Sequence, residues 1–170
     1  MARLFDWLND PQRQQKIIGA RLNAEFDALQ VEGLWTPAIT FATPGDLSVS
    51  YDSQDGTYVK VGPWVHAAFV IATSVFTHTT AAGNFLITGL PFAIAGVSGE
   101  VQRGGNTEWR GITKANYTDI ILQASSAGGS SLELVMSGSA QSSDNVAAAD
   151  MPTGGSVRLR GFFSYIAGSS

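Results

Sequence analysis

The stretch Trp64-Val65-His66-Ala67-Ala68-Phe69-Val70-Ile71-Ala72-Thr73-Ser74-Val75-Phe76 decides the fold class. Its residues alternate with the two-residue period of a β-strand, in which successive side chains point to opposite faces of a sheet. One face is apolar and consists of Val65, Ala67, Phe69, Ile71, Thr73 and Val75. The opposite face is also largely apolar and consists of Trp64, His66, Ala68, Val70, Ala72, Ser74 and Phe76. A monomeric sandwich rarely covers both faces of one strand, so we expect contact between copies of the chain to cover the second face.

Similar short runs of strand-forming residues occur on both sides of this stretch. Turn clusters separate them, among them Asp55-Gly56, Gly83-Asn84, Gly104-Gly105-Asn106 and Gly128-Gly129-Ser130. The other expected strands are Ile39–Phe41, Leu47–Tyr51, Thr57–Val61, Asn84–Leu90, Gly99–Arg103, Tyr117–Gln123, Leu132–Ser137 and Ser156–Ile166. Eight or nine short strands without a helical pattern between them predict a mainly β fold, an antiparallel β-sandwich of jelly-roll-like type. In the last strand, Val157, Leu159, Phe163 and Tyr165 alternate with Arg158, Arg160, Phe162 and Ser164.

A change of composition divides the chain near Gly33. Residues 1–32 hold nine of the 24 charged residues, whereas the other 138 residues share fifteen. Every serine and threonine and eighteen of the nineteen glycines lie after residue 32. The first part is rich in helix formers and the second in residues that suit strands and turns. We therefore expect an N-terminal anchor segment with a helix over 1–32 and a β-sandwich head over 33–170.

The N-terminal helix is predicted by its end signals. Asp10 is a good N-cap, Pro11 suits the first helical position, and Gly33 is placed to end the helix. One narrow apolar stripe, spaced four, four and three residues apart, consists of Ile18, Leu22, Phe26 and Leu29. Two arrangements suit this stripe. It packs on the head of its own chain, or three such stripes pack around a symmetry axis as a trimerisation helix.

An apolar cluster precedes the helix and consists of Leu4, Phe5, Trp7 and Leu8. It either folds back on the helix or inserts as a plug into a partner protein. Aromatic side chains at a terminus that usually frays favour the plug.

Composition excludes several classes of function. The chain has 170 residues, no cysteine and a net charge of −4. The lack of cysteine excludes disulfides, cysteine-ligated zinc and thiol chemistry, and the acidic balance argues against a nucleic-acid partner. No apolar run approaches the roughly 20 residues that cross a bilayer, so we expect no membrane insertion. Because the first residues lack the long uncharged stretch of a signal peptide, we expect synthesis in the cytosol.

Residue patterns typical of catalysis are scarce. His66 lies in an apolar strand and is expected to be a hydrogen-bonded core or interface residue, whereas His78 is expected to be solvated. The sequence has no H-x-x-x-H pair, Asp-rich calcium loop, Walker loop or G-x-S-x-G elbow. We therefore expect neither enzymatic activity nor a cofactor nor a bound metal. Glu108-Trp109-Arg110 is expected in a polar loop, where the Trp109 indole either stacks on a sugar ring or caps one end of the sandwich.

Three motifs resemble a pattern of tailed-bacteriophage fibre proteins. Gly56-Thr57-Tyr58-Val59-Lys60-Val61-Gly62 is followed, after a long strand, by Gly83-Asn84-Phe85-Leu86-Ile87-Thr88-Gly89-Leu90-Pro91-Phe92. In those proteins a G-x-Y-x-K-x-G stretch precedes an I-T-G-L-P-F-like one. The ending, from Ala149-Asp150-Met151-Pro152 through Ser156-Val157-Arg158 to Phe163-Ser164-Tyr165-Ile166, is similar to the last loop and strand of such domains. The resemblance covers residues 33–170.

This resemblance implies a homotrimeric virion protein that contacts the host cell surface and is made in the host cytoplasm. On this basis we expect the helical stripe to trimerise, the apolar cluster at residues 4–8 to dock on capsid or tail proteins, and Trp109 and Arg110 to contact a host glycan or protein. The chain departs from long fibres because a single helix precedes its head. A short tail fibre, a head fibre or a spike is therefore expected. A capsid decoration or connector protein without a receptor is the alternative.

Overall fold

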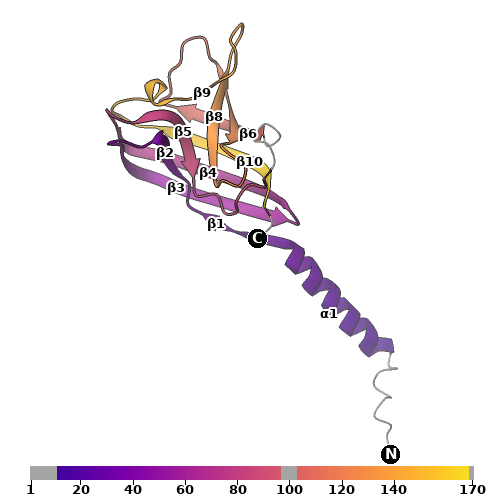
Figure 1. Cartoon of the computed structure of the whole chain (residues 1–170). Helices are drawn as coiled ribbons and strands as arrows, with labels where there is room; N and C mark the ends of the chain where they lie inside the picture. The colour runs from indigo at the N-terminus through magenta and orange to yellow at the C-terminus, as the bar shows by residue number, and fades with distance from the viewer. Residues whose placement is uncertain (1–10, 97–102, 169–170) are drawn as a thin grey trace, which may run out of the picture.

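The computed structural model describes residues 11–96 and 103–168 (Figure 1). One helix, α1 (Pro11–Leu29), precedes the strands, and a short 3₁₀ helix, η3 (Ala148–Asp150), lies before the last of them. The strands are β1 (Gln30–Trp35), β2 (Ala38–Thr43), β3 (Ser48–Val61), β4 (Trp64–Thr77), β5 (Ala82–Thr88), β6 (Arg103–Arg110), β7 (Asp119–Ala124), β8 (Ser131–Ser137), β9 (Asp144–Asn145) and β10 (Arg158–Ile166).

The strands form one antiparallel sheet in the order β1-β3-β4-β10-β6-β7-β8-β5-β2, with β9 beside β8. The strands β1 and β2 follow each other in the chain, yet they lie at opposite ends of this order. A short connection can join them because the sheet curls round on itself and brings its two ends together (Figure 1). The two halves of the curled sheet face each other as the layers of a sandwich do. The predicted fold class, a mainly β antiparallel sandwich preceded by one helix, is confirmed.

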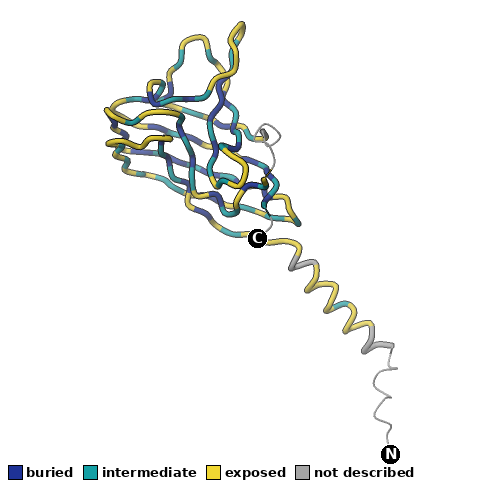
Figure 2. Tube along the Cα trace, in the orientation of Figure 1, coloured by how far each residue is buried: buried dark blue, intermediate teal, exposed yellow. Residues whose placement is uncertain are grey.

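The core lies between the two halves of the sheet. Buried residues alternate along the strands of the head, whereas the described residues of α1 are mostly exposed (Figure 2). Phe41 contacts Phe76 and Phe85 edge to face, with ring centroids 6.1 and 5.8 Å apart. His78, whose polar neighbours in the sequence predict a solvated ring, is buried against Phe41, with ring centroids 5.0 Å apart. The prediction of a solvated His78 was wrong. Its neighbours in the sequence, Thr77, Thr79 and Thr80, are polar, but the His78 side chain itself points into the core.

The helix ends at Leu29, and β1 begins at the next residue. The backbone N–H of Gly62, in the β3–β4 turn, donates a hydrogen bond of 3.0 Å to the carbonyl of Leu29. Gly33 does not end the helix, as was expected, but lies inside β1 opposite Tyr58 of β3. A side chain at Gly33 would collide with the Tyr58 ring, so this glycine is required by packing rather than by a helix end.

Three expected turns lie within strands, and one of them is Gly83-Asn84, which falls near the start of β5. Asp55-Gly56 lies within β3, which joins the two expected strands Leu47–Tyr51 and Thr57–Val61 into one. Gly104-Gly105-Asn106 lies within β6, where a Cβ at Gly105 would collide with the carbonyl oxygen of Phe162 on β10. Gly56 and Gly105 therefore mark close approach of a neighbouring group, and reading them as turns was wrong. The expected strand Gly99–Arg103 lies outside the described residues except for Arg103, which begins β6.

Candidate functional site

The strands β1, β3, β4, β10 and β6 have an outer face that the described residues leave uncovered, and the strand register arranges this outer face in rows. The row nearest the helix is Gln30, Val61, Trp64 and Ile166, and the next is Glu32, Val59, His66 and Ser164. The third row is Leu34, Thr57, Ala68, Phe162 and Asn106. The last two rows are Asp55, Val70, Arg160 and Glu108, and then Ser53, Ala72, Arg158 and Arg110.

The three rows nearest the helix expose large apolar side chains. Leu34 is 82% exposed, Trp64 58% and Phe162 45%, and Val59 and Val61 are exposed as well. Isolated apolar side chains are normal on a protein surface, but an array on neighbouring strands is typical of an interaction surface. The prediction that the second face of the Trp64–Phe76 stretch is covered by another copy stays a prediction.

Two residues, Val75 and Phe76, were assigned to the wrong side of this stretch. Val75 is 41% exposed, although its odd number placed it with the buried Val65. Phe76 is fully buried, although its even number placed it on the outer face with Trp64. The register between β3 and β4 shifts around Tyr51, so the alternation of β4 changes after Thr73. A β-bulge of this kind turns every following side chain to the other face.

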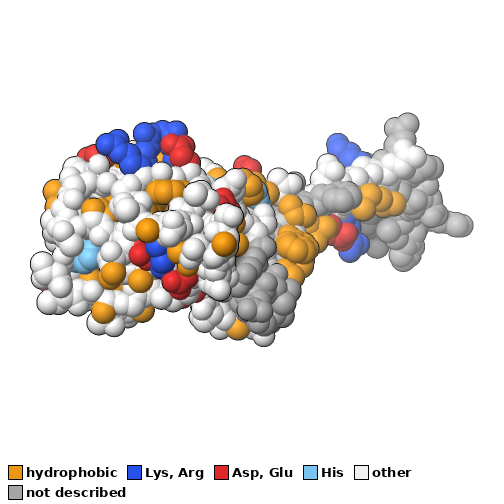
Figure 3. All heavy atoms as spheres, turned by 90° about the horizontal axis from the view of Figure 1, so that it is seen from above, with side chains coloured by type: hydrophobic (Ala, Val, Ile, Leu, Met, Phe, Trp, Pro, Cys, Tyr) orange, Lys and Arg blue, Asp and Glu red, His pale blue; other side chains and the backbone are white. Residues whose placement is uncertain are grey.

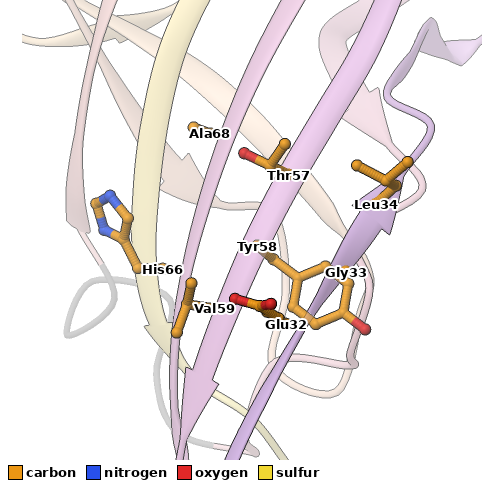
Figure 4. A pocket seen from close by; sticks show the side chains of 8 residues that line it. All are labelled: Glu32, Gly33, Leu34, Thr57, Tyr58, Val59, His66 and Ala68. Carbon is orange, nitrogen blue, oxygen red and sulfur yellow. The ribbon is translucent and has the colours of Figure 1, made fainter.

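Two open grooves meet on the outer face. The first, of about 420 Å³, has Glu32 and Leu34 of β1 on one side and His66 and Ala68 of β4 on the other (Figure 4). The second, of about 640 Å³, extends from the same His66 and Ala68 to residues of β10 and β6. The His66 ring lies beside the Phe162 ring, with centroids 5.3 Å apart, and the two rings separate the grooves as a ridge.

His66 is exposed and its Nδ1 lies 2.8 Å from the Ser164 hydroxyl oxygen. Of the two positions expected for it, the core is therefore wrong, and the interface stays a prediction. Its hydrogen bond fixes the imidazole plane across β4 and β10, the two strands that carry the ridge. The hydrogen bond and the ring contact therefore hold the His66 and Phe162 side chains in a defined position on the outer face.

The rows farthest from the helix are charged. Arg158 lies directly opposite Arg110, and the Arg160 guanidinium is 3.8 Å from the Glu108 carboxylate. Like charges on directly opposed positions of an antiparallel pair are unfavourable. On the β3 side, Asp55 is exposed and separated from Arg160 by Val70. The outer face is therefore basic along β10 and β6 and acidic along β1 and β3.

The predicted stripe of α1 is exposed where the structure describes it. Ile18, Leu22 and Leu29 are each about half exposed, and Ile17 beside them is exposed too. Figure 3 shows hydrophobic side chains gathered where the helix leaves the head. The structure does not show the stripe packed on its own head. The Phe26 side chain lies outside the described residues, as does the cluster of Leu4, Phe5, Trp7 and Leu8.

The two expected receptor residues lie on opposite faces of β6. Trp109 is half-buried, faces Leu159 of β10 and packs against the core, so its expected position in a polar loop was wrong. Its surroundings suit the alternative of a tryptophan that covers the edge of the core. Arg110 is exposed on the outer face. Contact of either residue with a host receptor stays a prediction.

Lys114 lies in a polar cluster of the head, away from the outer face. Its ammonium lies 2.7 Å from the Asp144 carboxylate and 3.2 Å from that of Asp150. The hydrogen bond from Lys114 holds the pKa of Asp144 below its usual value. Asp150 also accepts the N–H of Ala147, so the cluster joins the loop before β7 to η3 as a structural clasp. Among the described residues, no three His, Asp or Glu side chains are grouped so that they could hold a metal ion. No helix of the described ranges is both long and apolar enough to cross a membrane.

Neither a protein-family model nor a curated protein sequence matches this chain. Its fold is similar to the crystal structure of the Dettilon tailspike protein (gp208), with a TM-score of 0.58 and 15% sequence identity. The match covers 79% of this chain and 23% of that protein, so the chain corresponds to about a quarter of the tailspike's length. At this identity the similarity establishes a shared fold.

Proposed function

We propose that this chain is a virion structural protein of a tailed phage, a short fibre or spike whose β head is presented to the host cell surface for adsorption. The observation that carries the proposal is the similarity of its fold to a tailspike, together with the three fibre-like motifs of the sequence. The proposed role is structural attachment within the virion and binding to the host cell surface, and it involves no chemical reaction.

The proposed assembly is a homotrimer held first by α1. Leu22 is exposed on a helix that projects from the head, and Ile18 and Leu29 lie on the same stripe (Figure 1). Three such stripes packed around an axis remove these side chains from water, which contributes roughly 25 cal/mol for each Å² of apolar surface buried. The cluster of Leu4, Phe5, Trp7 and Leu8 would dock on capsid or tail proteins beyond the free end of the helix.

The proposed head binds a host-surface glycan or protein. Three heads on one axis, and several fibres on one particle, convert weak single contacts into firm attachment. Linked sites raise avidity by about 10²–10⁴ without a new kind of contact. The receptor residues therefore need only modest affinity, which agrees with a head surface that is mostly uncharged and without a deep pocket among the described residues (Figure 3).

Two measurements on the purified full chain test this function. Light scattering is expected to give three times the chain mass of 17.9 kDa, and a monomer would overturn the trimer. Added protein is expected to compete with the phage for adsorption to host cells. Absence of competition at saturating protein would overturn the receptor role and leave the decoration or connector protein, whose role is purely structural. A variant without residues 1–32 is expected to be lost from virions, as the docking role requires.

A further inference from the structure

We propose that the outer face is the interface between neighbouring heads, with the β1–β3 side of one copy packed against the β10–β6 side of the next. This inference rests on the proposed trimer and adds which surface of the head closes it. In this arrangement Leu34 of one copy contacts Phe162 of the next, and Asp55 pairs with Arg160.

The position of the helix supports a second copy as the occupant of the outer face. The helix runs without a linker into β1, the edge strand of this face, and Gly62 in the β3–β4 turn holds its last carbonyl. The α1 stripe and the outer face meet at this corner, where Leu29, Val61 and Trp64 are all exposed. Any association of three helices through the stripe therefore brings the β1 edges of three heads close to the same axis.

The direction of the helix sets which rows meet. Figure 1 shows α1 extending from the head in roughly the direction of β1 and β3. An axis along the helices then runs along the strands, and the rows of the outer face lie across it. Residues of one row consequently stand at the same height in every copy, so that Leu34 is level with Phe162, and Asp55 with Arg160.

The two halves of the outer face are complementary in shape. The β1–β3 half holds the groove lined by Glu32, Leu34 and Thr57, and on the β10 half the exposed Phe162 ring of the ridge lines the second groove. A cyclic trimer needs two different surfaces that fit each other, because each copy contacts the next head to tail. Groove and ridge on one chain meet that need, and Phe162 supplies the kind of aromatic side chain that is enriched at interfaces.

The charges are complementary in the same sense. Glu32 and Asp55 lie on the β1–β3 half and Arg158, Arg160 and Arg110 on the β10–β6 half, where Glu108 is their acidic neighbour. Two copies related head to tail place the acidic half of one against the basic half of the other. This arrangement also supplies an acidic partner near the opposed Arg158 and Arg110. Paired charges beside an apolar region select register and partner more than they add affinity.

Because the native chain has no cysteine, disulfide trapping tests the contact directly. Leu34 and Phe162 are three strands apart in one row, about 14 Å at the usual strand spacing. A disulfide needs Cα atoms about 4.4–6.8 Å apart, so the double variant Leu34→Cys/Phe162→Cys cannot close a bond within one chain. On mild oxidation of the full-length protein we expect covalent dimers and trimers that disappear on reduction.

Matched variants make the outcomes distinct. Leu34→Cys alone, Phe162→Cys alone, and Leu34→Cys with Ser143→Cys in the loop after β8 are expected to stay uncrosslinked. If either single variant crosslinked as extensively as the double variant, the same surface of two copies would be in contact with itself. That result would overturn the head-to-tail contact. A trimer in light scattering without crosslinks would overturn this interface while leaving the proposed function intact. A monomer would remove both.

Charge reversal tests the same contact without cysteine. Asp55→Arg and Arg160→Asp are each expected to raise the concentration at which the trimer dissociates by about fivefold or more, the equivalent of roughly 1 kcal/mol. The double variant Asp55→Arg/Arg160→Asp is expected to restore it, because the pair forms again with exchanged signs. No rescue in the double variant, with both single variants folded by circular dichroism, would mean that Asp55 and Arg160 do not meet.

Discussion

The Trp35 indole of β1 lies over Gly56, its direct partner on β3. The indole N–H reaches across that strand and donates to the carbonyl oxygen of Ala68 at 3.1 Å and to that of Thr57 at 3.2 Å. Two residues back along β1 the roles are exchanged, and the Tyr58 ring of β3 lies over Gly33. Edge strands with glycines lose packing area, and an aromatic ring from the neighbouring strand restores it. These two pairs fix the edge strand that the helix enters.

The first prediction concerns Gly56. A methyl group there collides with the Trp35 ring, so we expect Gly56→Ala to lower the free energy of unfolding by about 1–3 kcal/mol, the usual cost of overpacking. Urea denaturation followed by tryptophan fluorescence measures it. Gly154→Ala is the matched control, because open space surrounds Gly154. Equal stability of the Gly56 and Gly154 variants would show that the indole moves aside at no cost.

The second prediction concerns the α1 stripe. Leu22→Asp brings three carboxylates close to the proposed axis, and burying like charges without partners is strongly unfavourable. We expect this variant to be monomeric in light scattering at concentrations where the native chain is trimeric. Asn23→Asp adds the same charge one residue further along the helix, away from the stripe, and is expected to stay trimeric. An unchanged Leu22→Asp trimer would exclude the stripe from the interface.

The third prediction is a pH dependence at Asp46. The side-chain hydroxyl and backbone N–H of Thr79, with those of Thr80, donate to this carboxylate and hold its pKa well below the ordinary 3.8. A lowered pKa in the folded state means that the charged form stabilises the fold above pH 3.8 and that this contribution is lost as the pH falls below it.

We therefore expect Asp46→Asn to lower the melting temperature near neutral pH and to differ less from the native chain at about pH 2.5. Thermal unfolding at the two pH values measures the difference. A constant gap between the two proteins would assign the effect of Asp46 to packing rather than to its charge.

The fourth prediction concerns Tyr165. Its hydroxyl donates to the Phe92 carbonyl at 3.1 Å and accepts the Phe92 N–H at 3.3 Å. Tyr165→Phe is expected to cost about 1–2 kcal/mol at neutral pH, because it leaves the partly buried backbone groups of Phe92 without this partner. Chemical denaturation checks it, and an unchanged unfolding midpoint would contradict it.

The same residue predicts an alkaline effect. Burial raises the pKa of Tyr165 from 10.0 to about 12. The neutral phenol thus stabilises the fold below pH 10, and that contribution is lost as the pH rises from 10 to about 12. The gap between the native chain and Tyr165→Phe should therefore narrow over this range. A gap that stays constant over this range would mean that the phenolate is tolerated in the folded head.

The alternation of apolar residues predicted the central strands well. It placed the start of β4 at the observed residue and the start of β10 within two residues, and it separated Arg158, Arg160 and Phe162 from the opposite face of β10. The edge strand β1, Gln30–Trp35, was missed because it spans the change of composition at Gly33, where the helix was expected to end. Gly56 and Gly105 were read as turns because a sequence does not show which ring or carbonyl lies over a glycine.

The candidate site was predicted only in part. An apolar second side of β4 was evident, since it depends on neighbours in sequence. The row that joins Leu34 to Phe162 depends on the pairing of four strands that are far apart in the chain, which no local pattern encodes. Trp109 was placed in a loop for the same reason, because its inward direction depends on the register of β6 against β10.

The strand order has a consequence for how the head is made. The last strand of the domain, β10, lies in the middle of the sheet between β4 and β6. Until residues 158–166 have left the ribosome, both neighbours have unpaired edges, and the two halves of the sheet are not joined through this ladder. Pairing between strands that are far apart in the sequence slows folding, and until it is complete the unpaired strand edges are prone to aggregation. Pairing of residues 158–166 thereby becomes the step that completes the sheet, and we expect chains cut short before β10 to keep two open strand edges.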